Sequence, residues 1–164
     1  IGAYDGVHLG HQAVIRATQA AAARFGARTA LVTFDPHPAY VLRPESAPKL
    51  LTDLEQKLDL LEACGVETVV VVPFDQEAAH ETAEDFVARI VVGGLQARAV
   101  VVGADFHFGK ARGGNVGLLS VLGSLRGCEV EGLQLLPRPD GTTEAVSSRA
   151  DRRASSSETS PVRL

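Results

Sequence analysis

A nearly unbroken run of valines at residues 66–73, with the sequence VETVVVVP, constrains the fold of this chain more than any other segment. A strand that is apolar at consecutive positions buries both of its faces, as strands do in parallel sheets covered by helices on both sides. Shorter apolar runs at residues 29–34 and 99–103 have the same character. Because such runs alternate with segments of helical periodicity, the sequence predicts an α/β fold, a doubly wound, Rossmann-like parallel sheet of about five strands.

The remaining elements are expected from capping residues, apolar spacing and helix-stop glycines. Gly26 and the pair at residues 93–94 are predicted to end helices, whereas Pro36 and Pro38 predict an extended loop. Thr52 and Glu55 have the spacing of a capping box at a helix start. The chain is expected to begin with a strand stub at residues 1–3 and to end its regular structure with a strand at 129–136. Helices are expected at residues 11–25 and at 82 to about 92, and two further helices are expected to start at residues 52 and 115.

The composition excludes several classes of function. The 164 residues carry a formal net charge of −4, which argues against non-specific binding to nucleic acid or to anionic membranes. Aromatic residues make up 5% of the chain and Trp is absent, so an extended base-stacking surface is not expected. No apolar run approaches the roughly 20 residues that span a bilayer, and no signal peptide is recognised. Cys64 and Cys128 are expected to be buried thiols of a cytoplasmic protein.

The two ends of the chain carry separate expectations. Met is absent from the sequence, so the chain is expected to begin inside its first strand. Residues 147–164 are rich in Ser and Arg and lack apolar periodicity, so a disordered or divergent tail is predicted there. A single domain is therefore expected over residues 1–146, with no internal repeat or linker.

Residues 6–11, with the sequence GVHLGH, join an apolar start to a helical pattern. The N–H groups and the positive dipole end of a helix start can hold phosphate, and Gly6 and Gly10 would let the backbone approach it closely. The imidazoles of His8 and His11 add donors where negative charge develops in a transition state. This segment predicts a phosphate-binding turn, although in isolation the pattern also fits an ordinary capped turn.

Four of the five histidines fall in three loops, each of which follows a predicted strand. Besides the first turn, His37 follows the second strand and His107 follows the fourth. Loops at the carboxyl ends of parallel strands converge on one crevice, so these three are expected to form one site. Lys110 and Arg112 would add an anion-binding rim to it. His80 lies in a polar stretch and is expected at the surface.

Other chemistries lack their residue patterns in this chain. The histidine spacing does not match a zinc-binding helix, and no cysteine accompanies it, so no protein-bound metal is expected. Neither a G-x-S-x-G nucleophile elbow nor a G-x-x-x-x-G-K-[ST] phosphate loop occurs. Phosphate handling by histidines and a helix dipole is the favoured chemistry.

Four ordered motifs resemble those of the FMN adenylyltransferase domain of prokaryotic bifunctional riboflavin kinase/FAD synthetases. They are G-x-Y-D-G-V-H-L-G-H at residues 2–11, T-F-D-P-H-P at 33–38, L-L-T with Glu55 and Lys57 at 50–57, and V-G-x-D-F-x-F-G at 102–109. The likeness covers roughly residues 1–148 and implies a nucleotidyltransferase fold of the HxGH type. It also implies transfer of AMP from ATP to FMN, giving FAD and pyrophosphate, with Mg²⁺ accompanying ATP.

The resemblance implies roles for individual residues. His8 and His11 would be catalytic. ATP would be bound by Gly6, His8, Gly10, His11, Asp105 and Arg112. FMN would be bound by Asp35, Pro36, His37, Phe106 and Lys110. The riboflavin kinase domain that normally follows in the family is not found in these 164 residues.

One departure from the family pattern lies near the C-terminus. The family usually carries Ile-Ser-Ser-Thr-x-Ile-Arg after the last strand, whereas residues 146–152 read VSSRADR. Loss of an arginine that neutralises transition-state charge costs about 3 kcal/mol or more, unless Arg149 or Arg152 substitutes for it. An impaired enzyme is therefore one expectation.

Two alternatives stay open beside the adenylyltransferase. One is a non-catalytic nucleotide- or flavin-binding remnant, and the other is a nucleotidyltransferase with another acceptor. A class I tRNA synthetase fragment shares only the first motif and is disfavoured, because the chain is short and acidic.

Overall fold

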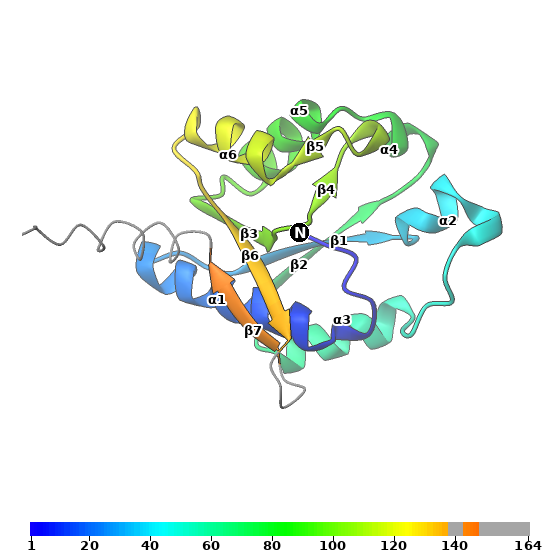
Figure 1. Ribbon diagram of the computed structural model, residues 1–164, viewed down its shortest axis with the longest axis horizontal. Helices are drawn as coiled ribbons and strands as arrows, with labels where there is room; N and C mark the ends of the chain where they lie inside the picture. Colours follow the sequence, from blue (N-terminus) through cyan, green and yellow to red (C-terminus); the bar gives the residue numbers. More distant parts are fainter. Residues whose placement is uncertain (138–142, 148–164) are drawn as a thin grey trace, which may run out of the picture.

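Parallel strands run through the middle of the molecule, with α1 and α3 on one side and α5 and α6 on the other (Figure 1). The computed structural model describes residues 1–137 and 143–147. The strands are β1 (Ala30–Asp35), β2 (Thr68–Pro73), β3 (Ala99–Gly103), β4 (His107–Phe108), β5 (Gly114–Asn115), β6 (Glu129–Pro137) and β7 (Thr143–Ser147). The α-helices are α1 (Leu9–Phe25), α2 (Pro38–Leu42), α3 (Leu54–Ala63), α4 (Gln76–His80), α5 (Ala83–Phe86) and α6 (Val116–Ser124). Short or wider helical turns are η1 (Asp5–Val7), η2 (Pro44–Ser46), η3 (Val87–Gly94) and η4 (Lys110–Arg112).

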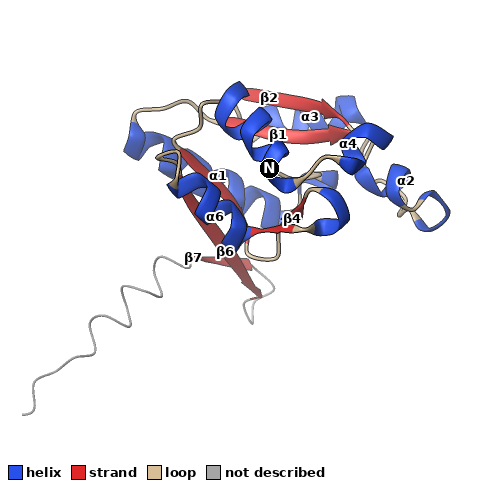
Figure 2. Ribbon diagram, turned by 90° about the horizontal axis from the view of Figure 1, so that it is seen from above, coloured by secondary structure: helices blue, strands red, loops and turns tan. Residues whose placement is uncertain are grey.

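The described strands form three separate sheets rather than one. β1 pairs in parallel with β2, β3 pairs in parallel with β6, β6 pairs with β7 in antiparallel orientation, and β4 pairs with β5. Figure 2 shows β1 and β2 lying together, apart from β6 and β7. The prediction of parallel strands in an α/β fold is confirmed, whereas a single sheet of about five strands is not what the described residues form.

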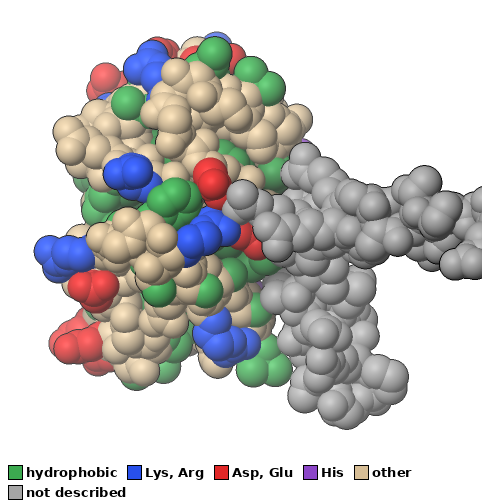
Figure 3. Space-filling view, turned by 90° about the vertical axis from the view of Figure 1, so that its left-hand side faces the viewer, with side chains coloured by type: hydrophobic (Ala, Val, Ile, Leu, Met, Phe, Trp, Pro, Cys, Tyr) green, Lys and Arg blue, Asp and Glu red, His purple; other side chains and the backbone are tan. Residues whose placement is uncertain are grey.

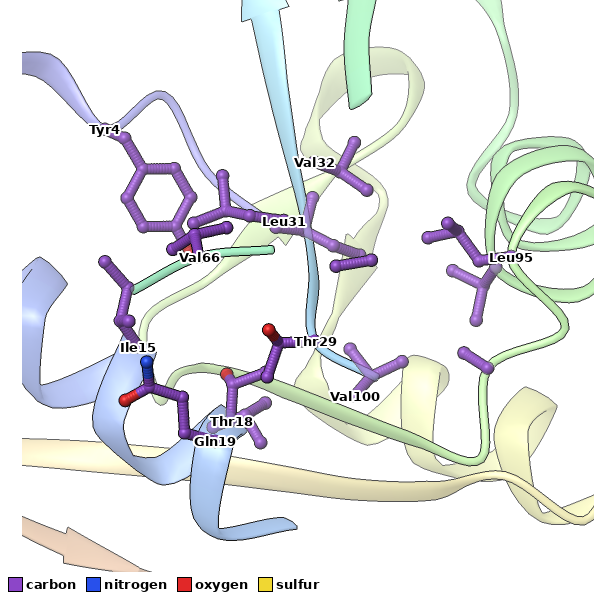
Figure 4. A pocket seen from close by; sticks show the side chains of 15 residues that line it. Tyr4, Ile15, Thr18, Gln19, Thr29, Leu31, Val32, Val66, Leu95 and Val100 are labelled. Carbon is purple, nitrogen blue, oxygen red and sulfur yellow. The ribbon is translucent and has the colours of Figure 1, made fainter. Parts of the chain in front are cut away.

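A small cavity of about 50 Å³ lies where the two larger sheets face each other. It is lined by residues of β1 and β3, with α1 and η3 closing it, and none of the predicted site residues takes part. Val32 lies on one side of it and Leu95 on another (Figure 4). The expected first strand at residues 1–3 is not a strand. The Gly2 N–H donates to the Val32 carbonyl at 3.0 Å, and the Thr33 hydroxyl donates to the Ala3 carbonyl at 3.1 Å.

Helix α1 forms as its sequence predicts. The His8 side chain caps its start, and Gly26 ends it with a φ of 59°, a left-handed conformation that glycine adopts without strain. Its buried face divides between two clusters, because Val14 packs with Val101 and Leu133, while Ile15 packs with Tyr4, Leu31 and Leu61. Each fully buried side chain of this kind contributes about 1.5–3 kcal/mol to folding, so α1 links the two larger sheets through packing.

The opposite face is covered by α5, η3 and α6. Thr82 caps α5 and Asn115 caps α6 as predicted. From Val87 the helix widens into a π-helix, in which the Leu95 N–H bonds to the Ile90 carbonyl at 2.9 Å. Glycine at position 93 suits this geometry, because an added Cβ would lie 3.0 Å from the Ala88 carbonyl oxygen.

Two predictions about helix starts were wrong. The capping box of α3 is formed by Asp53 and Gln56, not by Thr52 and Glu55, because Thr52 faces the opposite way, toward η1. Pro38 does not sit in an extended loop but starts α2, where its missing N–H costs nothing.

The strand predicted at residues 129–136 is confirmed as β6, but it is not the last strand. β6 is followed by β7, so Ser147 belongs to a strand rather than to a tail. Residues 148–164, including Arg149 and Arg152, lie outside the described part of the chain.

Candidate active site

The histidine turn is held in an unusual backbone shape. Tyr4, Gly6 and Val7 all have positive φ angles, of 52°, 69° and 41°. Non-glycine residues enter this left-handed region only where surrounding contacts over-determine it. The contacts that hold the turn come from a loop far along the chain, just before α3.

The Asp5 carboxylate is the centre of those contacts. Its Oδ1 accepts hydrogen bonds from the Leu51 N–H at 2.9 Å, the Thr52 N–H at 3.0 Å and the Thr52 hydroxyl at 3.1 Å. The Gly6 N–H in turn donates to the Thr52 hydroxyl oxygen at 3.2 Å. Desolvation acts to raise the pKa of Asp5, but these hydrogen bonds and the nearby His37 outweigh it and lower the pKa. We call this group of three residues, Asp5, Leu51 and Thr52, the Asp5 clamp.

The Asp5 clamp explains why a glycine occupies position 6. An added Cβ would lie 2.8 Å from Cδ1 of Leu51, and the φ of 69° already disfavours any side chain. The sequence predicted that the glycine leaves room for phosphate. In the structure, Leu51 covers the position that a Cβ would occupy. Gly10 is buried in the first turn of α1.

His8 and His11 lie together at the start of α1, as predicted. Their rings are stacked with centroids 3.6 Å apart, and Nδ1 of His8 accepts a hydrogen bond from the His11 N–H at 3.4 Å. Burial, and then the neighbouring His8, lowers the pKa of His11 to about 4. The Nδ1 atom of His11 is buried and has no hydrogen-bond partner among the described residues. An orphaned polar atom of this kind is unusual in a folded protein and is typical of a site that binds something.

The loop after β1 approaches this histidine pair. Nδ1 of His37 accepts the Ala39 N–H at 3.1 Å and so caps α2. Burial lowers the pKa of His37, and Lys57 adds to this effect while Asp5 opposes it. Asp35 and Pro36, which precede His37, are exposed. The first two predicted loops therefore do meet.

Lys57 belongs to one of the four family motifs, but the sequence analysis predicts no role for it in the site. It is a lysine on the inner face of α3 and is only 4% exposed. Asp35 and Asp5 interact electrostatically with it, and it interacts with His11 and His37. Its burial could have been predicted from spacing, because position 57 lies on the same helical face as Leu54 and Leu61.

The third loop lines a separate, apolar pocket of about 220 Å³. Five of the six phenylalanines in the chain line it, namely Phe34, Phe74, Phe86, Phe106 and Phe108. The rings of Phe106 and Phe108 are stacked with centroids 5.3 Å apart. In a chain with so few aromatic residues, this concentration gives the pocket a largely aromatic lining. His8 and His11 do not line this pocket, but Pro38, the neighbour of His37, does.

The polar residues of the third loop are divided by the structure. Arg112 and His107 line the apolar pocket, whereas Asp105 and Lys110 are exposed and are not among its lining residues. The Lys110 N–H donates to the Glu81 carbonyl at 2.7 Å, and the Glu81 carboxylate pairs with Arg89 at 2.7 Å. The described residues of the loops thus fall into two groups. His8 and His11 form what we call the histidine cluster, and residues of the third loop line the apolar pocket, to which Pro38 also belongs.

The other expectations concern the surface and the cysteines. His80 is exposed, as predicted. Cys128 is buried and Cys64 half-buried, and both are free. On the face shown in Figure 3, Lys and Arg side chains are dispersed among Asp and Glu. Among residues 1–137 and 143–147, no helix is long and apolar enough to cross a membrane, and no group of three His, Cys, Asp or Glu side chains is arranged to hold a metal ion.

Comparisons with known proteins agree with the motifs. A family model described as FAD synthetase matches residues 1–150. Proteins named bifunctional riboflavin kinase/FMN adenylyltransferase are 35% identical over 134 residues in Escherichia coli K12 and 37% over 134 residues in Pseudomonas fluorescens. Each of these alignments covers 82% of this chain and 43% of the relative. The Bacillus subtilis relative is 40% identical over 111 residues, 67% of this chain and 35% of its own length. The chain thus spans about two fifths of the length of the curated relatives it matches.

A solved structure also has the same fold. A protein from Streptococcus pneumoniae, described as a macrolide-efflux protein, superposes with a TM-score of 0.72 over 94% of this chain and 50% of its own. The sequence identity is 24%, so the likeness shows the fold alone.

Proposed function

Because the chain belongs to the FAD synthetase family, we propose that it transfers AMP from ATP to the phosphate of FMN, forming FAD and releasing pyrophosphate. The observation that carries this proposal is the pairing of two compartments. A histidine cluster at a helix start suits phosphate, and the apolar pocket beside it suits a flavin ring.

The ATP phosphates would lie at the start of α1, against His8, His11 and Gly10. The first N–H groups of a helix have no partner within the helix and attract anions. His11 is neutral near pH 7, because its pKa is about 4, so it would donate one N–H to phosphate. Bound phosphates would counteract the effects that lower this pKa, and the ring would gain a proton as negative charge accumulates beside it.

The flavin would enter the apolar pocket and stack beside Phe106, next to the loop of Asp35, Pro36 and His37. Pro38 lines the pocket and so connects that loop to it. Arg112 lines the same pocket, and we assign it to the nucleotide. Asp105 and Lys110, which are exposed, would contribute only at the rim, Asp105 toward ATP and Lys110 toward the FMN phosphate.

The reaction needs no covalent enzyme intermediate. An oxygen of the FMN phosphate would attack the α-phosphorus of ATP in line, the new P–O bond would form, and the bond to the β-phosphate would break. The electron pair of that bond leaves with pyrophosphate. Catalysis would come from holding the two substrates in line and from donors aimed at the phosphoryl oxygens.

Mg²⁺ would enter with ATP rather than reside in the protein. Mg²⁺ is usually bound through one or two carboxylates together with substrate phosphates. The Asp5 carboxylate is occupied by the clamp, whereas Asp35 is exposed in the adjoining loop and fits this role. The ion would neutralise part of the charge on the ATP phosphates.

The finer features of the fold belong to the same proposal. Helices on both sides of the parallel strands support a doubly wound arrangement of the HxGH nucleotidyltransferase type. We assign the catalytic domain to residues 1–146, as a unit that works beside a riboflavin kinase domain in longer relatives. The two free thiols suit a reducing compartment such as the cytoplasm.

Chromatographic detection of FAD tests the activity. The purified chain is incubated with FMN, ATP and Mg²⁺, and riboflavin with ATP is run in parallel. We expect FAD from FMN and no product from riboflavin. A folded chain that binds ATP and FMN without forming FAD would instead be the binding remnant, and a product with another acceptor would indicate a different nucleotidyltransferase.

A further inference from the structure

Lys57 is a buried cation without a counter-ion in contact. Three polar residues are buried among the described residues, namely Thr29, Thr33 and Lys57. The two threonines have hydrogen-bond partners. Within residues 1–137 and 143–147, the Lys57 ammonium group has no hydrogen bond and no carboxylate within ion-pair distance. Burying an ammonium group without a partner is costly.

Packing places α3 beside the histidine turn, because Leu61 of α3 lies in one buried cluster with Val7 of η1 and Ile15 of α1. The charges around Lys57, on the same face of α3, agree with this placement. Asp35, from the end of β1, and Asp5, from η1, act on it electrostatically. Its own charge acts on His11 of α1 and on His37. Neither carboxylate neutralises it by contact, since Asp5 directs its Oδ1 to the clamp. Its Nζ atom has no partner and is not among the polar atoms sealed from solvent in the described residues, so it keeps contact with solvent although the residue as a whole is buried.

We propose that Nζ of Lys57 is an anion subsite that binds the polyphosphate chain of ATP, opposite the start of α1. This inference rests on the proposed function for the identity of the nucleotide. The ammonium carries three donors and none is used within the described residues. A phosphate oxygen would supply the missing charge and the missing acceptor at the same time. Lys57 would then stabilise the charge on the departing pyrophosphate from the side opposite His8 and His11.

Binding of inorganic pyrophosphate tests the subsite apart from catalysis. Calorimetry on the full chain compares the wild type with Lys57→Met, which keeps the apolar stem of the side chain and removes the charge. We expect affinity to fall about tenfold or more in Lys57→Met, with Lys57→Arg retaining most of it. The matched control is Lys49→Gln, an exposed lysine, which should change affinity less than twofold.

The outcomes separate this inference from the proposed function. A chain that makes no FAD but loses pyrophosphate affinity in Lys57→Met supports the subsite and rejects the reaction. Unchanged pyrophosphate affinity in a folded Lys57→Met, shown by a wild-type circular dichroism spectrum, overturns the subsite whatever the activity. If Lys57→Met does not fold, Lys57→Gln replaces it, and unchanged affinity there overturns the subsite equally.

Discussion

The imidazole rings of His8 and His11 lie stacked, with centroids 3.6 Å apart and 22° between their planes. Two cationic rings at this distance repel each other. His8 is exposed and His11 is half-buried, so the cost of carrying a charge falls on His11, the ring that water solvates less. Burial and the neighbouring ring therefore lower the pKa of His11 to about 4, and its ring is neutral near pH 7.

The protonation of His11 should be visible in the free protein. We expect its ring resonances to titrate near pH 4, against 6.5 for an ordinary histidine. Because the unfolded chain takes up this proton more readily, the free energy of unfolding should fall as the pH drops from about 6.5 to about 4. Chemical denaturation over that range, compared between the wild type and His11→Gln, measures the effect. The slope should be shallower in His11→Gln and unchanged in His80→Gln, and equal slopes in all three proteins would contradict the assignment.

His11→Ala should lower turnover far more than FMN affinity. Removing a donor aimed at transition-state charge reduces turnover by about 100–1,000-fold, while the flavin pocket is lined by other residues. Steady-state formation of FAD gives both constants. His80→Ala, at an exposed histidine, serves as the control. An unchanged turnover number in His11→Ala would refute the role of that residue.

Asp5→Asn should loosen the histidine turn. Hydrogen bonds to a charged group contribute about 1.5–3 kcal/mol each, so part of that amount should be lost from the free energy of unfolding. Urea denaturation of Asp5→Asn, Thr52→Val and the double variant gives the coupling between the two residues. We expect a coupling of about 0.5–3 kcal/mol. Asp59→Asn, at an exposed position on α3, is the control, and strictly additive effects of the first two changes would argue against the clamp.

Gly6→Ala should cost more stability than Gly127→Ala. Both glycines have a φ near 70°, but an added Cβ meets Leu51 at position 6 and nothing within 4 Å at position 127. The left-handed backbone alone costs about 1–2 kcal/mol for a non-glycine residue, and contact with Leu51 adds to this only at position 6. Thermal denaturation compares the two. The difference should shrink when Leu51→Ala is combined with Gly6→Ala, and an undiminished difference would place the strain elsewhere.

Phe106→Ala should weaken FMN binding by about tenfold, which corresponds to about 1.4 kcal/mol of stacking and burial. Phe106 is partly exposed inside the pocket, so the substitution should leave folding largely intact. Phe25→Ala removes the one phenylalanine that does not line the pocket and should leave FMN binding unchanged. Quenching of flavin fluorescence on binding measures both variants. Equal effects of the two would show that the ring acts through stability rather than contact.

The elements of the fold followed from the sequence where the signal is local. The valine run gave β2, Gly26 ended α1, and Thr82 and Asn115 capped their helices. Each of these features depends on residues within one or two turns of each other. The start of α3 shows where local patterns fail, because Asp53 and not Thr52 caps the helix. Thr52 instead bonds to Asp5, which lies 47 positions away in the sequence, and no local pattern reveals that partner.

The sequence predicted the histidine turn and Phe106 as site residues, but it assigned no site role to the other phenylalanines that line the apolar pocket. His8 and His11 lie stacked in the first turn, and His37 lies close enough to Asp5 of that turn for their charges to interact. The phenylalanine pocket draws on β1, β4 and α5 as well as on loops. Phe34, Phe86 and Phe108 each read in sequence as an ordinary core residue, so only their contacts in space identify the pocket. Lys57 was not predicted as a site residue, because a single lysine on an amphipathic helix is normally solvated.

The separation between the two larger sheets has a mechanical consequence for the substrates. No backbone hydrogen bond of the described residues joins β1 to β3, so these two halves are connected by side-chain packing and by the chain itself. Phe34 belongs to one half, and Phe106 and Phe108 follow the strand of the other. If one half moved relative to the other, the width of the apolar pocket would change without breaking backbone hydrogen bonds between strands. A planar molecule bound between those rings would contact both halves and so restrict their relative movement, which no backbone hydrogen bond between β1 and β3 restricts in the described residues.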